Sequence, residues 1–384
     1  MQAKMNFCLI TGIFPPDIGG PATYVSKLAN YFISIGYHVE VITYADSSAE
    51  SDTLFAVHKI IRKQSGIRKY LQTKHLVEEV ASRSNIAYLN GLLIPASSAL
   101  ANKAIPKVAK IVGDPVWERS RNDGLTLQDF EEFQSSKQSI KIRFLQYLRN
   151  NALERMDKII VPSQFLRKVV ENWGFDGKVE LIYNGIEQCY GQEFLKISRE
   201  ESKRRLGFNG WVLISIGRLC NWKGFDAIIS SLKKLRDDTS LVIVGDGPDQ
   251  KRLEEITHIE GVGRRVIFAG RIEHQKLPLY LRASDCFILN SGYEGFPHII
   301  LEALKMECPV IAANRGGTPE LIKDGVNGIL VAKDSVKDIV ISVERIREDS
   351  VFRSSIIANG IENTKLYTWE MTAEKTRNLL EKMV

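Results

Sequence analysis

Short apolar runs alternate with segments of helical periodicity along the whole chain. Apolar runs that lack alternating polar residues are typical of buried strands in parallel sheets. Apolar residues at helical spacing predict helices over Ala22–Ile35 and Ala227–Leu235. The predicted strands are Phe7–Ile13, Val39–Tyr44, Ile86–Leu89, Lys110–Val112 and Lys158–Val161 in a first group, and Trp211–Ile216, Leu241–Val244, Val266–Phe268, Cys286–Leu289, Val310–Ala312 and Gly328–Val331 in a second.

This alternation predicts an α/β fold in which helices cover both faces of parallel sheets. The strands are too many for one open sheet of usual size, so we expect two doubly wound, Rossmann-like domains. The boundary should fall between Asn184 and Asn209, where a turn precedes a charged helical stretch. We assign residues 1–190 to the first domain and 191–365 to the second.

Size and composition limit the class of protein. A chain of 384 residues with 44% apolar content can bury a large core. No apolar stretch approaches the roughly 20 residues that cross a bilayer. The apolar segment Met5–Phe14 ends at two prolines without a cleavage site, so we expect it to be a first strand rather than a signal peptide. The five cysteines form no C-x-x-C pair, which argues against disulfide or metal sites and favours a reduced, cytoplasmic setting.

Positive charge is concentrated in the first half of the chain. The net charge is +6, but Lys59–Lys110 alone holds ten Lys or Arg against two acids. This stretch is either a solvated basic face or a binding surface. A binding surface of this kind would attract anionic lipid at the inner face of a membrane or a phosphorylated lipid acceptor. Nucleic acid is the weaker alternative, because regularly placed aromatic residues and binding motifs are absent.

A basic amphipathic helix is predicted over Gln138–Met156. Its apolar face serves either core packing or membrane contact. The residues of that face are Phe144, Leu145, Leu148, Ala152 and Met156.

The segment Ser291–Glu302 carries the strongest chemical indication. It follows a predicted strand, Gly295 supplies a turn, and Pro297 suits the first position of a helix. Free N–H groups at a helix start attract phosphates, and carboxylates accept hydrogen bonds from hydroxyl groups. With Glu294 at the turn and Glu302 in the helix, the segment indicates a nucleotide-sugar site.

A second strand end carries cations. Gly217 lets the chain turn sharply after Trp211–Ile216, which directs Arg218 and Lys223 toward the edge where α/β sheets bind ligands. These cations are either solvated on a surface loop or neutralise a leaving nucleoside diphosphate, which is electrostatic catalysis.

Two glycine pairs follow other strands of the second domain. Gly245 and Gly247 lack the third glycine of a dinucleotide fingerprint, so we interpret them as turn geometry. Gly316 and Gly317 either permit close approach to a ligand or to a neighbouring loop, or belong to a plain αβ connection.

The first domain offers two candidate sites. Gly19 and Gly20 precede a predicted helix, where they either bind a phosphate or sugar or form a flexible loop. Asp114 either positions an acceptor hydroxyl, with help from Glu118, or caps the turn before Pro115.

Together, several motifs resemble those of the family 4 retaining glycosyltransferases in order and spacing. The resemblance extends from near the first residue to the last and implies a GT-B architecture, with two Rossmann-like domains facing across a cleft and the donor held mainly by the second. The motifs are Gly217-Arg218 with Lys223-Gly224, Val244-Gly-Asp-Gly-Pro248, E-G-F-P-x4-E from Glu294 to Glu302, and Gly316-Gly317-x-Pro-Glu320.

The resemblance also implies residue roles. In the second domain, it implies that Arg218 and Lys223 bind the diphosphate and that Glu302 binds the ribose. It implies that Glu294 contacts the donor sugar and phosphates together with the backbone of Gly295, Phe296 and Pro297. The backbone near Arg271 and Ile272 would hold the base. In the first domain it implies that Gly19 and Gly20 face the diphosphate. Residues 366–384 resemble the segment that returns to the first domain, and Asn184–Glu187 matches the family's hinge.

One position departs from the family pattern: many relatives carry a histidine where this chain has Gly113, so that histidine's role does not transfer. The expected function is retaining transfer, without a metal or other cofactor, from a UDP- or GDP-sugar to a hydroxyl of a glycan or lipid-linked acceptor in cell-surface polysaccharide synthesis. The alternatives are a non-catalytic nucleotide-sugar-binding protein and a nucleotide-sugar epimerase on the same fold.

Overall fold

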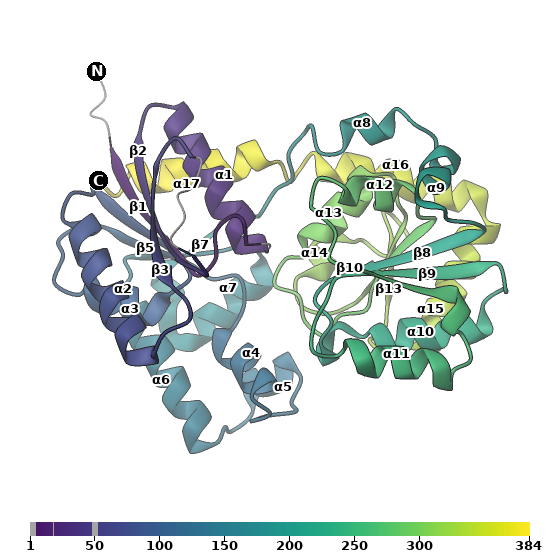
Figure 1. The fold of residues 1–384 in the computed structure, drawn as a ribbon, viewed down its shortest axis with the longest axis horizontal. Helices are drawn as coiled ribbons and strands as arrows, with labels where there is room; N and C mark the ends of the chain where they lie inside the picture. The colour runs from purple at the N-terminus through teal and green to yellow at the C-terminus, as the bar shows by residue number, and fades with distance from the viewer. Residues whose placement is uncertain (1–4, 18, 48–52) are drawn as a thin grey trace. The chain divides into compact units, whose positions relative to one another are not determined.

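The computed structural model describes residues 5–17, 19–47 and 53–384, which form two compact units. The first unit contains the residues through Gln128, together with Glu132–Ile182 and Ala373–Val384. The second contains Asp129–Glu131 and Tyr183–Thr372. Apart from Asp129–Glu131, the chain enters the second unit at Tyr183, just before the interval expected from the sequence (Figure 1).

In the described part of the first unit, seven parallel strands form a sheet in the order β3-β2-β1-β4-β5-β6-β7. The strands are β1 Asn6–Thr11, β2 His38–Ala45, β3 Ala56–Ile61, β4 Ile86–Asn90, β5 Lys107–Lys110, β6 Lys158–Val161 and β7 Val179–Leu181.

Three strands of this sheet differ from the sequence prediction. The edge strands β3 and β7 were not predicted, because β3 is mostly half-buried and is interrupted by His58 and Lys59, and β7 has three residues. The strand predicted at Lys110–Val112 is wrong in position, since β5 ends at Lys110 and Val112 is exposed. The apolar run therefore continues past the sheet into the loop that follows β5.

The second unit contains a six-stranded parallel sheet in the order β10-β9-β8-β11-β12-β13. All six strands predicted for this unit are confirmed, with ends that differ by at most two residues. The strands are β8 Trp211–Ile216, β9 Thr239–Val244, β10 Val266–Gly270, β11 Cys286–Leu289, β12 Val310–Ala313 and β13 Ile329–Val331.

Helices cover both faces of each sheet, which confirms the doubly wound prediction (Figure 1). Of the described helices, none combines the length and the apolar content that crossing a bilayer requires. Up to residue 170 the helices are α1 Gly20–Ser34, α2 Gly66–Ala81, α3 Leu93–Ala99, α4 Pro115–Asn122, α5 Phe130–Ser135, α6 Ile140–Glu154 and α7 Gln164–Val170. Beyond it they are α8 Gln192–Leu195, α9 Arg199–Leu206, α10 Phe225–Ser231, α11 Gln250–Ile259, α12 Leu277–Arg282, α13 His298–Lys305, α14 Thr318–Leu321, α15 Val336–Glu348, α16 Ser350–Thr364 and α17 Trp369–Glu381.

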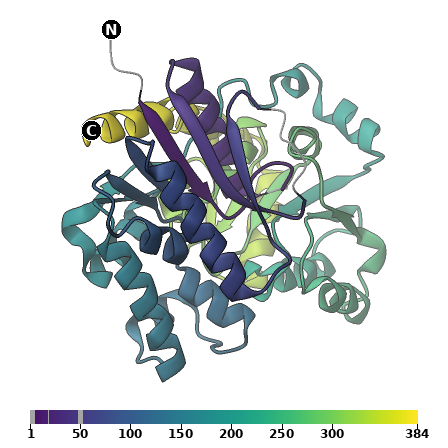
Figure 2. The same ribbon diagram turned by 60° about the vertical axis from the view of Figure 1, so that its left-hand side comes forward.

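The C-terminal helix α17 returns to the first unit. Figures 1 and 2 both show it beside β1, and the Tyr37 hydroxyl donates a hydrogen bond to Glu381. Before α17, Thr368 pairs with Ile186 in the expected hinge motif. Gly185 is required at this crossing, because a β-carbon there would collide with the carbonyl oxygen of Thr368.

The face of α6 that points to the core differs from the prediction. Ala152 and Met156 are buried as expected, but Phe144 is 58% exposed. Instead, Ile142 and Arg149 face inward. A cation can occupy the inner face here because Arg149 Nη1 lies 2.8 Å from Oδ1 of Asp114.

Candidate functional site

The second sheet has a topological switch point between β8 and β11. From β8 the chain proceeds outward through β9 and β10, and then crosses to the other side through β11, β12 and β13. In open α/β sheets, ligands bind in the crevice at the carboxyl ends of the strands at such a point. The loops that follow β8 and β11 carry Arg218, Lys223 and Glu294, so the structure brings three predicted residues to this crevice.

Lys223 and Glu294 form an ion pair at this point. Lys223 Nζ lies 2.5 Å from Oε1 of Glu294, and both side chains are largely buried. A β-carbon at Gly217 would lie 3.8 Å from Cε of Lys223, so the side chain of Lys223 passes directly over this glycine. Arg218 follows Gly217 and is exposed. The crevice thus presents two cations and one carboxylate.

Glycines hold the loops around this ion pair close together. Gly316 has a φ of +57°, and a β-carbon there would collide with the carbonyl oxygen of Glu294. The N–H of Gly317 donates a 2.8 Å hydrogen bond to the same oxygen. Of the alternatives for this glycine pair, the structure therefore supports close approach to a neighbouring loop. Gly245 similarly packs on the carbonyl of Gly217, as expected of turn geometry.

Glu302 lies on α13 between two side chains that the sequence did not single out. The Tyr190 hydroxyl donates a 3.0 Å hydrogen bond to Oε2, and Nε2 of His274 lies 3.1 Å from Oε1. Burial, followed by the charge of Glu302, raises the pKa of Tyr190 far above its usual range, so this hydroxyl stays protonated and donates. Tyr190 and His274 were missed because each is distant from Glu302 along the chain.

The turn before α13 presents mainly backbone. The helix begins at His298, one residue later than predicted, and Pro297 precedes it. The ring of Phe296 is buried, with its centroid 5.4 Å from that of Tyr183. The side chain of Phe296 therefore anchors the turn, whose backbone at Gly295–Pro297 leads into the helix N-terminus.

The predicted base-binding residues follow β10. Arg271 Nε lies 2.6 Å from Oδ2 of Asp246, and this carboxylate raises the pKa of the Arg271 guanidinium. Ile272 packs against the hydrophobic cluster that also contains Tyr190. Ile272 thus lies on the same side of the second sheet as α13, whose Ile300 and Leu304 belong to this cluster.

In the first unit, Asp114 is fully buried at the start of α4. It caps the helix by accepting a 2.9 Å hydrogen bond from the N–H of Val116, and it also accepts bonds from Arg149 and from Nε2 of Gln134, each at 2.8 Å. This arrangement favours the capping alternative for Asp114. Its proposed contact with an acceptor stays a prediction.

Gly19 and Gly20 lie at the start of α1, which begins at Gly20. A β-carbon at Gly19 would lie 2.8 Å from Cδ1 of Ile13, whereas none of the surrounding atoms lies within 4 Å of one at Gly20. Gly20 thus leaves open space at this helix N-terminus. Among the described residues, no group of three or more His, Cys, Asp or Glu side chains is arranged to hold a metal ion.

Comparisons with known proteins match this chain to glycosyltransferases. The glycosyl transferases group 1 model matches residues 198–363, and the glycosyltransferase family 4 model matches residues 18–188. An uncharacterized glycosyltransferase of Methanocaldococcus jannaschii is 27% identical over 394 residues, which cover 98% of this chain and 97% of the relative.

Two solved structures share the fold over their whole length. A sucrose-phosphate synthase from Thermosynechococcus elongatus superimposes with a TM-score of 0.82 at 19% identity, covering 99% of both chains. The Anabaena protein HepE in complex with UDP-glucose gives a TM-score of 0.79 at 20% identity, covering 98% of this chain and 100% of that one. The two solved structures show that the chain has the GT-B fold. The two family models, over residues 18–188 and 198–363, show that it belongs to the family 4, group 1 glycosyltransferases.

Proposed function

We propose that the protein transfers a sugar from a nucleoside-diphosphate donor to a hydroxyl acceptor with retention of the α configuration and without a bound metal ion. The observation that carries this proposal is the Lys223–Glu294 pair, held at the switch point of the second sheet beside Arg218. HepE, which shares the fold, was solved with UDP-glucose, and this supports a UDP-sugar as the first donor to test.

In the proposed reaction, the bond between the anomeric carbon and the diphosphate oxygen breaks while a bond to the acceptor oxygen forms on the same face. The acceptor proton passes to an oxygen of the departing diphosphate. Arg218 and Lys223 stabilise the negative charge that develops there. Glu302 binds the ribose hydroxyls, and Glu294 with the Gly295–Pro297 backbone orients the sugar.

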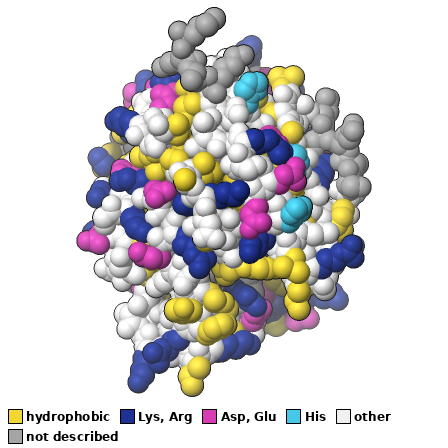
Figure 3. Space-filling view, turned by 90° about the vertical axis from the view of Figure 1, so that its left-hand side faces the viewer, with side chains coloured by type: hydrophobic (Ala, Val, Ile, Leu, Met, Phe, Trp, Pro, Cys, Tyr) yellow, Lys and Arg dark blue, Asp and Glu magenta, His cyan; other side chains and the backbone are white. Residues whose placement is uncertain are grey.

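The acceptor is proposed to be a glycan or a lipid-linked saccharide of the cell surface, reached at the cytoplasmic face of a membrane. The outer face of α6 supports this proposal. Ile140, Phe144 and Tyr147 lie on it at helical spacing and are 86%, 58% and 61% exposed. Lys141 and Arg143 are exposed beside them, so this face combines apolar and cationic groups. Figure 3 shows apolar and basic side chains side by side at the bottom of the view, where α6 lies.

The donor half of the proposal is tested by ligand-induced stabilisation. UDP, GDP, ADP and dTDP are added separately to the wild type, to Glu302→Ala and to the control Glu255→Ala, whose exposed residue lies on α11. We expect one nucleotide to raise the melting temperature of the wild type and the control, and to do so less in Glu302→Ala. If no nucleotide at millimolar concentration stabilises the wild type, the donor assignment is wrong.

The catalytic half is tested with the sugar form of the stabilising nucleotide. Arg218→Ala should lower nucleotide release by about 10²–10³, because removing one preorganised donor of transition-state stabilisation has an effect of this size. Arg264→Ala, at an exposed arginine of the same unit, should stay near wild type. Near-normal turnover in Arg218→Ala would contradict the mechanism, and a β-linked product would contradict retention.

A further inference from the structure

Two adjoining cavities lie at the carboxyl ends of β4 and β5 in the first unit. One has a volume of about 200 Å³ and the other about 260 Å³. Both are lined by Leu92, Leu93 and Pro115, so these three residues form a common wall. Each cavity alone is smaller than the roughly 300 Å³ at which ligand pockets begin, whereas the two together exceed it.

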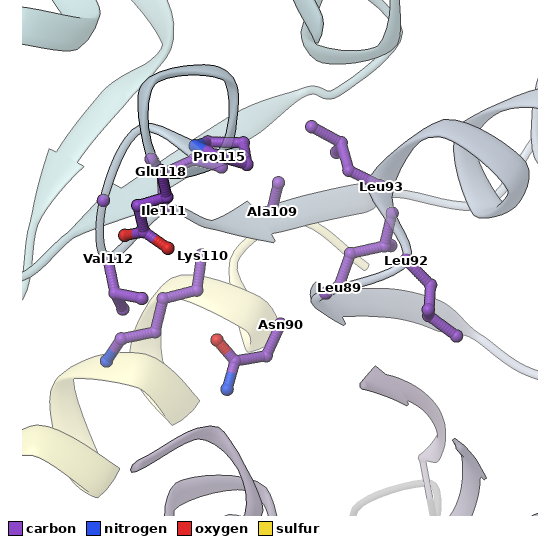
Figure 4. Close-up of a pocket in the computed structure, with 12 residues that line it drawn as sticks. Leu89, Asn90, Leu92, Leu93, Ala109, Lys110, Ile111, Val112, Pro115 and Glu118 are labelled. Atoms are coloured by element: carbon purple, nitrogen blue, oxygen red, sulfur yellow. The ribbon is translucent and has the colours of Figure 1, made fainter. Parts of the chain in front are cut away.

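The first cavity contains a buried cation. Lys110 lines it with only 4% of its surface exposed, and its ammonium lies 3.6 Å from the ring centroid of Tyr24. The amide of Asn90, also buried, lines the same space, and one acid, Glu118, lines it from an exposed position. Figure 4 shows Lys110 and Asn90 on one side of this cavity and Leu92 and Leu93 on the other.

Burying this ammonium costs free energy, because the group loses its contact with water. Desolvation lowers the pKa of Lys110, and the nearby Tyr24 opposes the shift without cancelling it. An anion next to a buried ammonium is favoured, because it restores electrostatic stabilisation that the ammonium lost with water.

The second cavity is apolar. Its walls include Ile94 and Pro95 of α3, Val116 of α4 and Leu145 of α6. The guanidinium of Arg149 also reaches it, but Asp114 pairs with this group. This cavity therefore suits a hydrocarbon chain rather than a charged group.

The common wall is held in an unusual conformation. Leu92 has a φ of +49°, in the left-handed region that leucine rarely adopts. Such strain persists where the surrounding structure fixes it and often marks a ligand site. Here it places the leucine side chain between the cation and the apolar cavity.

We propose that these two cavities bind the acceptor, and that the acceptor is an amphiphile whose anionic group contacts Lys110 and Asn90 while its hydrocarbon chain occupies the space between α3, α4 and α6. This inference rests on the proposed function, which it extends by assigning the acceptor to a chemical class. A phosphate or phosphodiester next to a lipid chain has both features. A free phosphate or a soluble sugar phosphate has only the first.

The test measures binding by isothermal titration calorimetry with three probes: octyl phosphate below its micellar concentration, octyl glucoside and inorganic phosphate. Octyl phosphate should bind at least about tenfold more tightly than either of the others, because only it supplies both features. Equal binding of inorganic phosphate would identify a site for a free phosphate and overturn the proposal. So would equal binding of octyl glucoside, or no binding of octyl phosphate.

Two variants separate the contributions of charge and chain. Lys110→Met should weaken the binding of octyl phosphate at least about tenfold and leave the binding of octyl glucoside unchanged. The control Lys107→Met, at the other end of β5, should change the affinity for octyl phosphate less than about twofold. Leu145→Phe fills the apolar cavity and should remove the advantage of octyl phosphate over inorganic phosphate. Unchanged octyl phosphate affinity in both Lys110→Met and Leu145→Phe would overturn the assignment.

A third variant guards against misfolding of Lys110→Met. Asn90→Asp replaces the amide by a carboxylate of the same size, which repels an anion. It should therefore weaken the binding of octyl phosphate and leave the binding of octyl glucoside unchanged. The nucleotide that stabilises the wild type should stabilise all these variants equally. Failure of the donor proposal would thus appear as a missing nucleotide shift in the wild type, and failure of the acceptor proposal as unaltered amphiphile binding.

Discussion

The Tyr190 hydroxyl donates a hydrogen bond to Oε2 of Glu302 across 3.0 Å. This contact joins the segment after the hinge to α13, over 112 positions of sequence. Since His274 lies against the other carboxylate oxygen, Glu302 is oriented from both sides before a ligand binds. Such orientation lowers the entropic cost of binding a ribose diol.

Replacing Tyr190 by phenylalanine removes this orientation but keeps the ring. We expect Tyr190→Phe to weaken nucleotide binding about two- to tenfold, because a typical hydrogen bond contributes a net 0.5–1.5 kcal/mol. Glu302→Ala should weaken it more. Calorimetric titration of the stabilising nucleotide measures both, with Tyr280→Phe on α12 as a control that should bind normally. Tighter binding by Tyr190→Phe would show that this hydroxyl competes with the ligand for Glu302.

The ion pair between Lys223 and Glu294 makes separate predictions for stability and turnover. Lys223→Met leaves the carboxylate of Glu294 without its ammonium, so both stability and turnover should fall, turnover by about 10²–10³. Adding Glu294→Gln removes the unpaired charge and should restore much of the stability to urea. Turnover should stay low, since the cation that faces the diphosphate is still missing. Recovery of turnover in the double variant would mean that Lys223 acts only through Glu294.

Gly316 and Gly325 form a matched pair for testing the close approach to Glu294. Both have a positive φ, +57° and +70°, but a β-carbon at Gly325 meets open space. Gly325→Ala should therefore destabilise the protein only by the strain of a left-handed residue, about 1–2 kcal/mol. Gly316→Ala should destabilise it more and also weaken nucleotide binding, because it displaces the backbone of Glu294. Urea unfolding and nucleotide titration compare the two, and equal effects would rule out the loop contact.

The sequence predicted the second sheet better than the first, for a physical reason. Strands such as β8 and β11 are buried on both faces and appear as continuous apolar runs. The edge strand β3 is largely half-buried, and its sequence Ala56–Ile61 includes a histidine and a lysine, so it lacks that pattern. Residues 48–52, which precede β3, lie outside the described residues.

The sequence predicted which residues lie together where they follow strands, and it missed the contacts that distant segments make. Lys223 and Glu294 each follow a buried strand, so the topology alone places them together. Tyr190 and His274 follow no such rule, because their contact with Glu302 depends on how α13 packs. Helical spacing grouped Phe144 with Ala152 and Met156, but the buried face of α6 contains the charged Arg149, which a pattern of apolar residues does not reveal.

The outer face of α6 predicts binding to anionic membranes. Phe144→Glu should lower the fraction of protein that floats with phosphatidylglycerol vesicles, because it removes an exposed apolar group and adds repulsion. The control, Ile259→Glu, alters an exposed isoleucine on α11 of the second unit and should leave flotation unchanged. Binding should also fall as salt concentration rises. Equal flotation of Phe144→Glu and wild type would contradict membrane contact through α6.

The buried ammonium of Lys110 predicts how stability depends on pH. Its pKa is lowered in the folded state by desolvation, so the unfolded chain holds this proton more tightly. The resulting destabilisation is fully present below the folded-state pKa and disappears as pH rises toward the unfolded value near 10.5. Lys110→Met removes the buried charge and should raise the melting temperature at neutral pH by about 2–4 °C, roughly the effect of 1 kcal/mol.

Urea unfolding between pH 7 and pH 10.5 measures this directly. The difference in stability between Lys110→Met and wild type should be greatest at neutral pH and shrink as pH rises, since the wild-type lysine then loses its proton in both states. Burial raises the pKa of Tyr88, so its titration also changes stability with pH, but this contribution is common to both proteins and cancels in the difference. The same pH series on Lys107→Met should show no such trend. If Lys110→Met were less stable than wild type at pH 7, the ammonium would be stabilising the ligand-free fold, and its cavity would not be held ready for an anion.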